Sequence, residues 1–368
     1  MFKSSILDLF LVFLRLGLTS FGGPIAHLGY FRHEFVVRRR WLDEHAYADL
    51  VALCQFLPGP ASSQVGIAIG LSRAGIPGAI ASFLGFTLPS AIALVLFVLG
   101  VTYFGDQLGT GWLHGLKVVA VAVVAQAVWG MGNSLAPDRV RATIAVVATG
   151  IATLFPSALG QVAVIAGSGL IGAAFLQTDS VLPHTLLQVR IGRVTGALLL
   201  LLFFGLILVL PLLAAGSDNY VLKLFDSFYR SGSLVFGWGH VVLPLLQAQV
   251  VPTGWVSNDA FLAGYGAAQA VPGPLFTFAA YLGAVSTRSP SGWQGAAIAT
   301  GAIFLPAFLL IVGTLLFWEQ LRRHPAIKRA MLGINAAVLG LLLAAFYNPV
   351  WISAIKSAPD FWLSWRRS

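Results

Sequence analysis

The chain has 368 residues, of which 58% are hydrophobic and only 10% are charged, with a mean hydropathy of +0.86. Soluble domains carry about 25% charged residues, so this composition cannot build a water-facing surface. It excludes a soluble enzyme and a nucleic-acid-binding domain, and the single Cys54 excludes a disulfide scaffold. The formal net charge of +9 is instead typical of cytoplasmic loops rich in Arg and Lys. We expect an all-α polytopic membrane protein.

Two broken apolar segments open the chain. The first, 6–31, is interrupted at Phe21-Gly22-Gly23-Pro24, and the second, 45–71, is interrupted at Pro58-Gly59-Pro60. Because Pro and Gly cannot continue a hydrogen-bonded helix, backbone groups are released at these points. A membrane tolerates such breaks only where they are packed in protein or line a cavity. Paired interrupted segments are therefore typical of a transporter binding site.

The rest of the chain alternates unbroken and broken segments. Four spans are predicted at 76–103, 112–131, 142–155 and 157–176, followed by a connecting span at 195–215, broken segments at 220–251 and 258–285, and spans at 293–317 and 330–346. We expect a first repeat at 1–176, a cytoplasmic loop and connecting transmembrane helix at 177–217, and a second repeat at 218–368 that is shortened at its end.

The second pair of broken segments repeats the first. Arg15 matches Arg230 and Phe21-Gly22 matches Phe236-Gly237 at an offset of 215, Gln55-Phe-Leu-Pro58-Gly59-Pro60 matches Gln269-Ala-Val-Pro272-Gly273-Pro274 at 214, and Leu88-Pro89 matches Leu305-Pro306 at 217. Ordered matches with slowly drifting offsets indicate a duplication.

The basic loops of the two repeats occupy opposite positions. The loop at 32–41 holds four Arg, whereas its counterpart at 247–255 holds no Lys or Arg; the loop at 319–329 holds Arg and Lys that its own counterpart lacks. Since basic loops stay in the cytoplasm, the repeats are predicted to be inverted. Broken segments that act as re-entrant hairpins segregate the charges best. Broken segments that cross the membrane fully remain the alternative.

These motifs, together with Phe86-Thr-Leu-Pro89, resemble the signature of the chromate transporter (CHR) family in its long, duplicated form. The resemblance covers nearly the whole chain. It implies a carrier in the inner (cytoplasmic) membrane that expels chromate and confers chromate resistance. Family members also act on other oxyanions, and sulfate, a near-isostere of chromate, is the second candidate cargo.

Arg15 and Arg230 are the first candidates for anion binding. Each lies in an apolar helix shortly before a break. Because a lone Arg at the bilayer centre costs at least ~2.5 kcal/mol, an Arg in such a position is interpreted as functional. Two inverted copies would present guanidinium groups to both sides of a tetrahedral dianion. The alternative is that each Arg snorkels or pairs with Asp8 or Asp226.

The breaks are the second candidate. A half-helix that starts after Pro60 or Pro274 presents free N–H groups and a positive dipole end to an anion. The alternative is a kink that serves packing only. The predicted substrate site comprises Arg15, Phe21, Gly22, Gly23, Gln55, Pro58, Gly59, Pro60, Ser62, Ser63, Arg230, Phe236, Gly237, Gln269, Pro272, Gly273, Pro274 and Thr277.

Four further residues are candidates for coupling transport to a proton or another ion. They are His27, Asp49, Lys117 and His240. A His titrates near neutral pH, but a satisfied cavity residue is the alternative for both histidines. Lys117 is also explained by snorkelling, and Asp49 by pairing with an Arg of 38–40.

The chain has no Walker motif, so a secondary carrier is the leading prediction. A channel-like anion pathway is the main alternative. A membrane enzyme is weaker, because Ser62 and Ser63 have no His and Asp partners at plausible spacing. We expect no cofactor, no metal and no nucleic acid; the expected partners are the oxyanion, the lipid bilayer and a second copy in a homodimer.

Overall fold

The computed structural model describes residues 5–21, 23–108, 135–155, 158–177, 192–235, 242–315 and 324–352, with a few positions in 121–133 and 317–318. These residues form helices and no strand, as the composition predicts. The helices are α1 (Ile6–Thr19), α2 (Gly23–Arg32), α3 (Glu44–Phe56), α4 (Ala61–Leu108), α6 (Arg139–Leu154), α7 (Ala158–Phe175), α8 (Arg193–Ala215), α9 (Tyr220–Leu234), α10 (Val242–Val250), α11 (Asn258–Ala270), α12 (Phe278–Val285), α13 (Gly292–Thr314) and α15 (Pro325–Ala345). The predicted spans at 76–103, 142–155, 157–176, 195–215, 293–317 and 330–346 each correspond to one of these helices, whereas the span predicted at 112–131 lies largely outside the described residues.

Four stretches of the described residues are long and apolar enough to cross a membrane. They are Ala61–Val101, Arg193–Ala215, Gly292–Thr314 and Pro325–Asn348. A bilayer core about 30 Å thick requires roughly 20 helical residues. The expectation of an all-α polytopic membrane protein is therefore confirmed.

The helices stop at the predicted breaks. α1 ends at Thr19, α3 ends at Phe56, α9 ends at Leu234 and α11 ends at Ala270. Within the two Pro-Gly-Pro motifs, Gly59 has φ of 120° and Gly273 has φ of 103°. Only glycine adopts such values without strain, which explains why both motifs have Gly between the prolines.

The broken helices of the two repeats begin with equivalent caps. Ser5 caps α1 and Asn219 caps α9; Asp43 caps α3 and Ser257 caps α11. In each case the side-chain oxygen accepts a hydrogen bond from a backbone N–H of the first turn, which would otherwise have no partner. Asp43 and Ser257 are separated by 214 residues, as the Pro-Gly-Pro motifs are; Ser5 and Asn219 are also separated by 214, one less than the offset of 215 between α1 and α9. The duplication therefore extends to the starts of the helices.

α4 consists of two arms rather than one straight helix. The backbone leaves the helical region at Ala74 and Gly75, and a Cβ on Gly70 would collide with the carbonyl oxygen of Gly78. In a straight helix these two residues would lie about 12 Å apart along the axis, so the chain folds back at Gly75. α12 and α13 make the same close contact between Gly283 and Gly295.

Each repeat also packs its first helix tightly on its long span. A Cβ on Gly17 of α1 would lie 2.7 Å from the Phe86 oxygen of α4, and a Cβ on Gly232 of α9 would collide with the Ile303 oxygen of α13. These residues are equivalent at offsets of 215 and 217. Backbones approach this closely only where no side chain intervenes, as is common between membrane helices.

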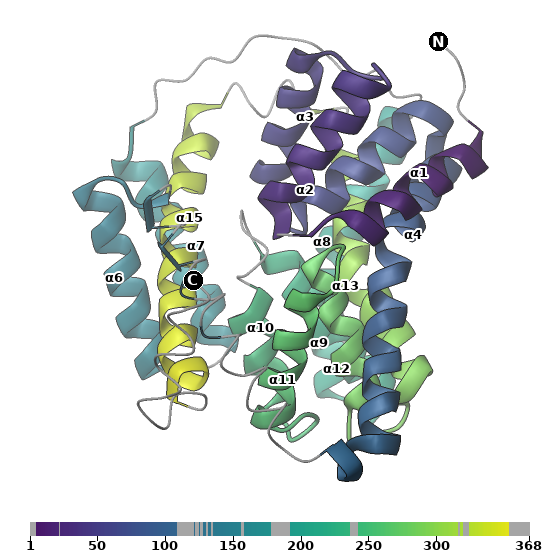
Figure 1. Cartoon of the computed structure of the whole chain (residues 1–368). Helices are drawn as coiled ribbons and strands as arrows, with labels where there is room; N and C mark the ends of the chain where they lie inside the picture. The colour runs from purple at the N-terminus through teal and green to yellow at the C-terminus, as the bar shows by residue number, and fades with distance from the viewer. Residues whose placement is uncertain are drawn as a thin grey trace.

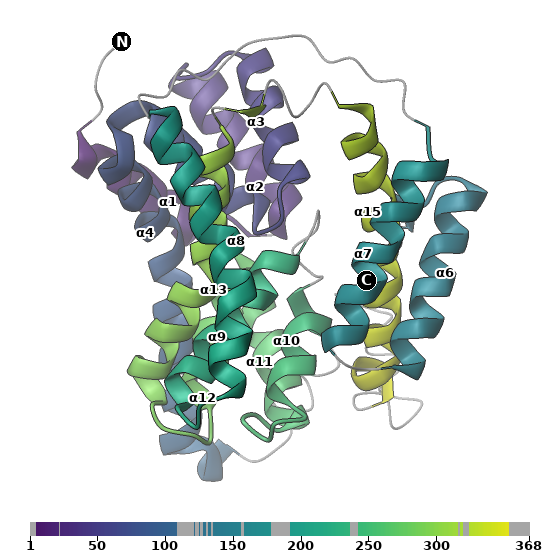
Figure 2. The same ribbon diagram turned by 180° about the vertical axis from the view of Figure 1, so that it is seen from behind.

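The short helices of the two repeats lie at opposite ends of the molecule. Figure 1 shows α1, α2 and α3 at one end and α9 to α12 at the other, with the second arm of α4 reaching from the first end to the second. From behind, α8 runs beside α13 and α9 over most of the height (Figure 2). α6, α7 and α15 form a separate group, in which Gly333 of α15 contacts the Ser168 backbone of α7.

Candidate functional site

The breaks of one repeat bind the breaks of the other. The Gly59 N–H donates a hydrogen bond to the Val235 carbonyl oxygen at 2.6 Å, and the Gly273 N–H donates to the Ser20 carbonyl oxygen at 2.9 Å. Gly59 and Gly273 are repeat-equivalent at an offset of 214, and Ser20 and Val235 at 215. The two hydrogen bonds are therefore reciprocal copies of one contact.

The same reciprocity holds for packing against the long spans. A Cβ on Gly59 would lie 3.6 Å from the Ala307 Cβ of α13, and a Cβ on Gly273 would lie 2.8 Å from the Ser90 Oγ of α4. Ser90 and Ala307 are equivalent at the offset of 217. Each Pro-Gly-Pro motif therefore lies on the long span of the other repeat.

A group of polar side chains is buried around the first-repeat breaks. The His27 ring is 1% exposed, lies beside the Ser20 backbone, and has its Nδ1 3.4 Å from the Ser62 Oγ. Its ring also packs edge-on against Phe86, with centroids 5.4 Å apart. Ser62 lies in the first turn of α4, where backbone N–H groups have no intrahelical acceptor. Polar groups of α2 and α4 thus meet beside the first break.

Several of these buried polar atoms have no hydrogen-bond partner. Around the first-repeat breaks, the unpartnered atoms of the described residues are Ser20 Oγ, His27 Nε2, Ser63 Oγ, Gln64 Oε1 and Thr87 Oγ1; around the second-repeat breaks they are Asp226 Oδ1, Arg230 Nε and Gln269 Nε2. Buried polar atoms usually have a partner, and leaving one without costs about 1–3 kcal/mol. A polar ligand with several oxygen atoms would satisfy the hydroxyl and imidazole groups.

Three of these residues were missed by the sequence analysis: Ser20, Gln64 and Thr87. Each has a local signal. Ser20 immediately precedes Phe21-Gly22, and Gln64 lies four residues after Pro60, with its Nε2 donating to the Pro58 oxygen at 2.8 Å. A polar residue beside a break in an otherwise apolar segment is thus a better guide than the charged residues alone.

The two repeat-related arginines have different surroundings. Arg230 is 25% exposed and forms an ion pair with Asp226, which is 3% exposed, at 2.5 Å. Arg15 is exposed on α1 and forms no ion pair with a described residue, because Asp8 pairs with Arg39 instead. The alternative of an acid-paired arginine is thus observed for Arg230 and not for Arg15.

The other predicted site residues are exposed, buried beside a partner, or outside the described residues. Gln55 and Phe21 are exposed, and Asp49 is buried in α3. The Thr277 hydroxyl already donates to the Pro274 oxygen at 2.7 Å, and Gln269 lies beside the Tyr265 hydroxyl. Gly22, Lys117, Phe236, Gly237 and His240 lie outside the described residues. Among the described candidates, the structure brings together His27 and Ser62.

The loop at 32–41 forms a basic cluster. Glu34 accepts hydrogen bonds from Arg39 at 2.7 Å and from Arg38 at 2.9 Å. Arg39 and Arg73 stack over the Trp41 ring, 5.0 Å and 4.9 Å from its centroid. Burial acts to raise the pKa of Glu34, but hydrogen bonds from Arg39 and Arg38 outweigh it and hold the pKa below its ordinary value.

A groove of 540 Å³ lies between α6 and α7. Its lining includes Thr143 and Ser168 but no charged side chain. It is an unsuitable site for a dianion, whose desolvation needs charge or many donors. The described residues also contain no cluster of three His, Cys, Asp or Glu that would hold a metal ion.

The fold and the contacting breaks define the class of this protein: a polytopic helical membrane protein built from interrupted helices. The chain belongs to the chromate transporter family, whose model matches residues 7–173 and again residues 222–365. The two matched ranges correspond to the two predicted repeats.

Curated relatives match over most of the chain. A chromate transport protein of Pseudomonas aeruginosa is 30% identical over 94% of this chain and 82% of its own length. A probable chromate transport protein of Synechococcus elongatus is 28% identical over 90% of this chain and 81% of its own. A chromate transport protein of Cupriavidus metallidurans is 27% identical over 92% and 81%, respectively. No solved structure matches this chain significantly.

Proposed function

We propose that this chain is a secondary carrier that exports chromate from the cytoplasm across the inner (cytoplasmic) membrane. The observation that carries the proposal is the reciprocal pair of hydrogen bonds from Gly59 to Val235 and from Gly273 to Ser20. Interrupted helices that meet where two repeats contact each other are the usual site of substrate in secondary transporters. The names of the relatives supply the substrate.

Two inverted repeats with re-entrant hairpins account for the arrangement of the helices. α1, α2, α3 and α9 to α12 have 8 to 15 residues each, too few to cross a bilayer core alone. The short helices of the two repeats lie at opposite ends (Figure 1). α8 and α15 begin at the same end as α3, with Arg193, Lys328 and Arg329 in or near their first turns. This basic end faces the cytoplasm under the positive-inside rule.

The anion binds at the N-terminus of α4, on the free backbone N–H groups beside Ser62 and Ser63. The positive end of the helix dipole favours a negative ligand there. Of the two arginines, Arg230 is the better candidate for a direct or water-mediated contact, because it lies within the fold and close to a break. Arg15 is exposed and would serve the approach of the anion.

The membrane potential favours export. Each charge that crosses is worth about 2.3 kcal/mol per 100 mV, so a dianion leaving an inside-negative cell gains about 4.6 kcal/mol at 100 mV. No nucleotide hydrolysis is needed. Sulfate is the competing cargo, since it has the same tetrahedral shape and charge, and a channel-like pathway is the competing mechanism.

The proposal is tested with cells that express the chain or an empty vector, and with everted vesicles made from them. We expect the chain to lower the chromate content of cells and to raise chromate uptake by everted vesicles, with excess sulfate as the competitor. Higher chromate content in expressing cells would show import, and no change in either assay would show that chromate is the wrong cargo.

A further inference from the structure

The two repeats share a backbone but differ in polarity at the breaks. The first-repeat positions are polar: Ser20, His27, Gln64, Thr87 and Ser90. Their counterparts, at the offsets that relate the nearest matching motifs, are Val235, Val242, Phe278, Phe304 and Ala307. Four of these counterparts are 0–1% exposed and belong to one apolar core. At these five described positions, the polar side chains of the first copy are thus replaced by apolar ones in the second.

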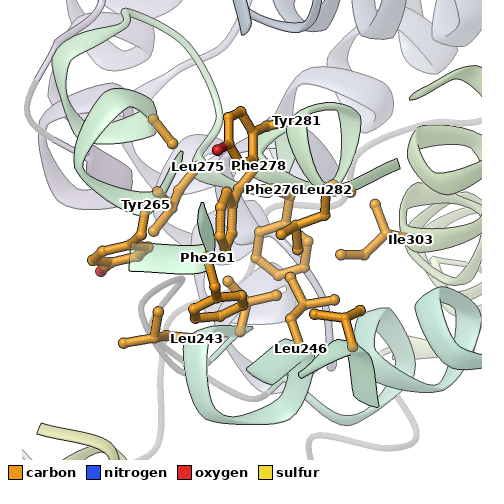
Figure 3. Close-up of a cluster of buried hydrophobic side chains, with 14 of the residues drawn as sticks. Leu243, Leu246, Phe261, Tyr265, Leu275, Phe276, Phe278, Tyr281, Leu282 and Ile303 are labelled. Carbon is orange, nitrogen blue, oxygen red and sulfur yellow. The ribbon is translucent and has the colours of Figure 1, made fainter. Parts of the chain in front are cut away.

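The second-repeat counterpart is filled by aromatic side chains. Phe278, at the position of Gln64, packs edge-on against Phe261 with centroids 5.1 Å apart and against Tyr265 at 5.7 Å. Phe276 packs against Phe304 at 5.9 Å. Figure 3 shows Phe261, Tyr265, Phe278 and Tyr281 gathered in one cluster with neighbouring leucines. An oxyanion there would lose its hydration without gaining donors.

Among the described counterparts of the first-repeat hydroxyls, only that of Ser63 is also a hydroxyl, and it already has a partner. Thr277, at the position of Ser63, donates to the Pro274 oxygen at 2.7 Å, whereas the Ser63 Oγ has no partner although Ser63 is 2% exposed. His27 Nε2 and the hydroxyls of Ser20 and Thr87 are likewise buried without partners. Among the described residues around the breaks, the buried hydroxyl and imidazole groups without a partner therefore belong to the first repeat, while the unpartnered second-repeat atoms are those of Asp226, Arg230 and Gln269.

We infer that the transported oxyanion has a single, one-sided site, in which Ser20, His27, Ser63 and Thr87 of the first repeat recognise its oxygens. The second repeat contributes the backbone of its breaks, the charge of Arg230 and a rigid aromatic support. This inference rests on the proposed function and names the residues that determine specificity at that site. Hydroxyl and imidazole donors are largely neutral, so they select a ligand by the tetrahedral arrangement of its oxygens and not by its charge alone.

The site also gives a role to the hydrogen bond by which the second repeat holds the first-repeat break in place. Because the Gly273 N–H binds the Ser20 carbonyl oxygen, movement of the Gly273 break would displace the segment that carries the Ser20 hydroxyl. The equivalent hydrogen bond, from Gly59 to Val235, holds an apolar residue instead. The two reciprocal contacts thus serve different purposes, one at the anion and one in the apolar core.

The test uses variants that give the first repeat the residues of the second: Ser20→Val and His27→Val, with Ser20→Ala and Ser63→Ala as smaller changes. Ser233→Ala is the matched control, because the Ser233 hydroxyl is equally buried but already donates to the Tyr229 oxygen at 2.7 Å. KM and the maximal rate of chromate uptake are measured in everted vesicles at equal protein content, together with thermal stabilisation of the purified protein by chromate.

We expect KM to rise about ten- to a hundredfold in the first-repeat variants, because each loses a hydrogen bond to a charged ligand. Stabilisation by chromate should be lost in parallel, while the unliganded midpoint of Ser20→Ala and Ser63→Ala and the KM of Ser233→Ala stay near wild type. Wild-type KM in Ser20→Ala, Ser63→Ala and His27→Val would overturn the one-sided site alone. Absence of chromate transport by the wild type would overturn the proposed function and this inference with it.

Discussion

Asp226 and Arg230 form an ion pair on α9, one turn before a break, in which the carboxylate is buried and the guanidinium is partly buried. Removing one member of such a pair leaves the other charge without compensation and typically costs 3–5 kcal/mol, whereas removing both costs far less. The pair therefore links two roles that the sequence cannot separate, since an arginine that stabilises the fold and one that binds an anion look alike in the chain.

Double substitution separates these roles. We expect Arg230→Gln to lower the thermal unfolding midpoint strongly, because Asp226 stays buried and unpaired, and we expect Asp226→Asn combined with Arg230→Gln to recover most of the loss. Midpoints of the purified variants measure this. If the double variant is as unstable as Arg230→Gln, the ion pair is not the source of the effect. If it is stable and transports with wild-type KM, Arg230 has no part in binding.

Glu34 makes the stability of the basic loop depend on pH. Its pKa in the folded protein lies below the ordinary value of 4.5, so the unfolded state takes up a proton first as the pH falls. Its contribution is complete above about pH 5 and is lost as the pH falls through the folded-state pKa.

We expect Glu34→Gln to unfold at a lower temperature than wild type at pH 7, and the gap to shrink below about pH 4.5. Glu44→Gln is the control, because its pair with Arg32 is half-exposed and contributes about 0–1 kcal/mol. A gap that is constant from pH 7 to below pH 4 would contradict this assignment of the ion pairs.

At the scale of elements, the close glycine contacts fix how each repeat is packed. Gly17 lies on Phe86 and Gly232 on Ile303, with no space for a methyl group. Gly205 on α8, by contrast, has nothing within 4 Å of an added Cβ. Equivalent glycines in both repeats, facing equivalent backbone atoms, indicate that these contacts belong to the ancestral unit.

Gly17→Ala and Gly232→Ala should each destabilise the protein by about 1–3 kcal/mol, because the added methyl group must push two backbones apart. Gly205→Ala should be neutral or slightly stabilising, since alanine favours a helix. Thermal unfolding in one detergent measures all three. Equal midpoints for Gly232→Ala and Gly205→Ala would show that α9 and α13 do not pack as described.

The positions of the elements were largely predictable, and the surroundings of their side chains were not. Pro-Gly-Pro breaks, caps and offsets are local properties, so the ends of α1, α3, α9 and α11 follow from the chain itself. Arg15 and Arg230 align in sequence, yet α8 packs on α9, with the Tyr229 hydroxyl donating to the Phe203 oxygen, while Arg15 stays exposed. Which face of a helix becomes covered depends on tertiary packing.

At the scale of the molecule, inverted repeats place equivalent turns on opposite sides of the membrane. The turn between the two arms of α4 then lies on one side, and the turn between α12 and α13 lies on the other. Ile76 follows the turn between the arms of α4, and Ser289 lies between α12 and α13; both are exposed. The sole cysteine, Cys54, is buried and can be replaced to give a silent background.

We expect an impermeant maleimide to label Ser289→Cys in intact cells and Ile76→Cys only after the membrane is permeabilised, both in a Cys54→Ser chain that retains transport. The reason is the positive-inside rule, which keeps the basic cluster around 32–41 and Arg73 in the cytoplasm. Labelling of both cysteines from the same side would exclude inverted repeats.

The proposed carrier mechanism moves chromate between the two repeats rather than through an open pore. It is tested most directly by purified protein in liposomes, with labelled chromate outside and either unlabelled chromate or buffer inside. We predict saturable uptake that is accelerated by internal chromate, because a carrier returns faster with substrate bound. Uptake no greater than in protein-free liposomes, or uptake that neither saturates nor responds to internal chromate, would contradict the account.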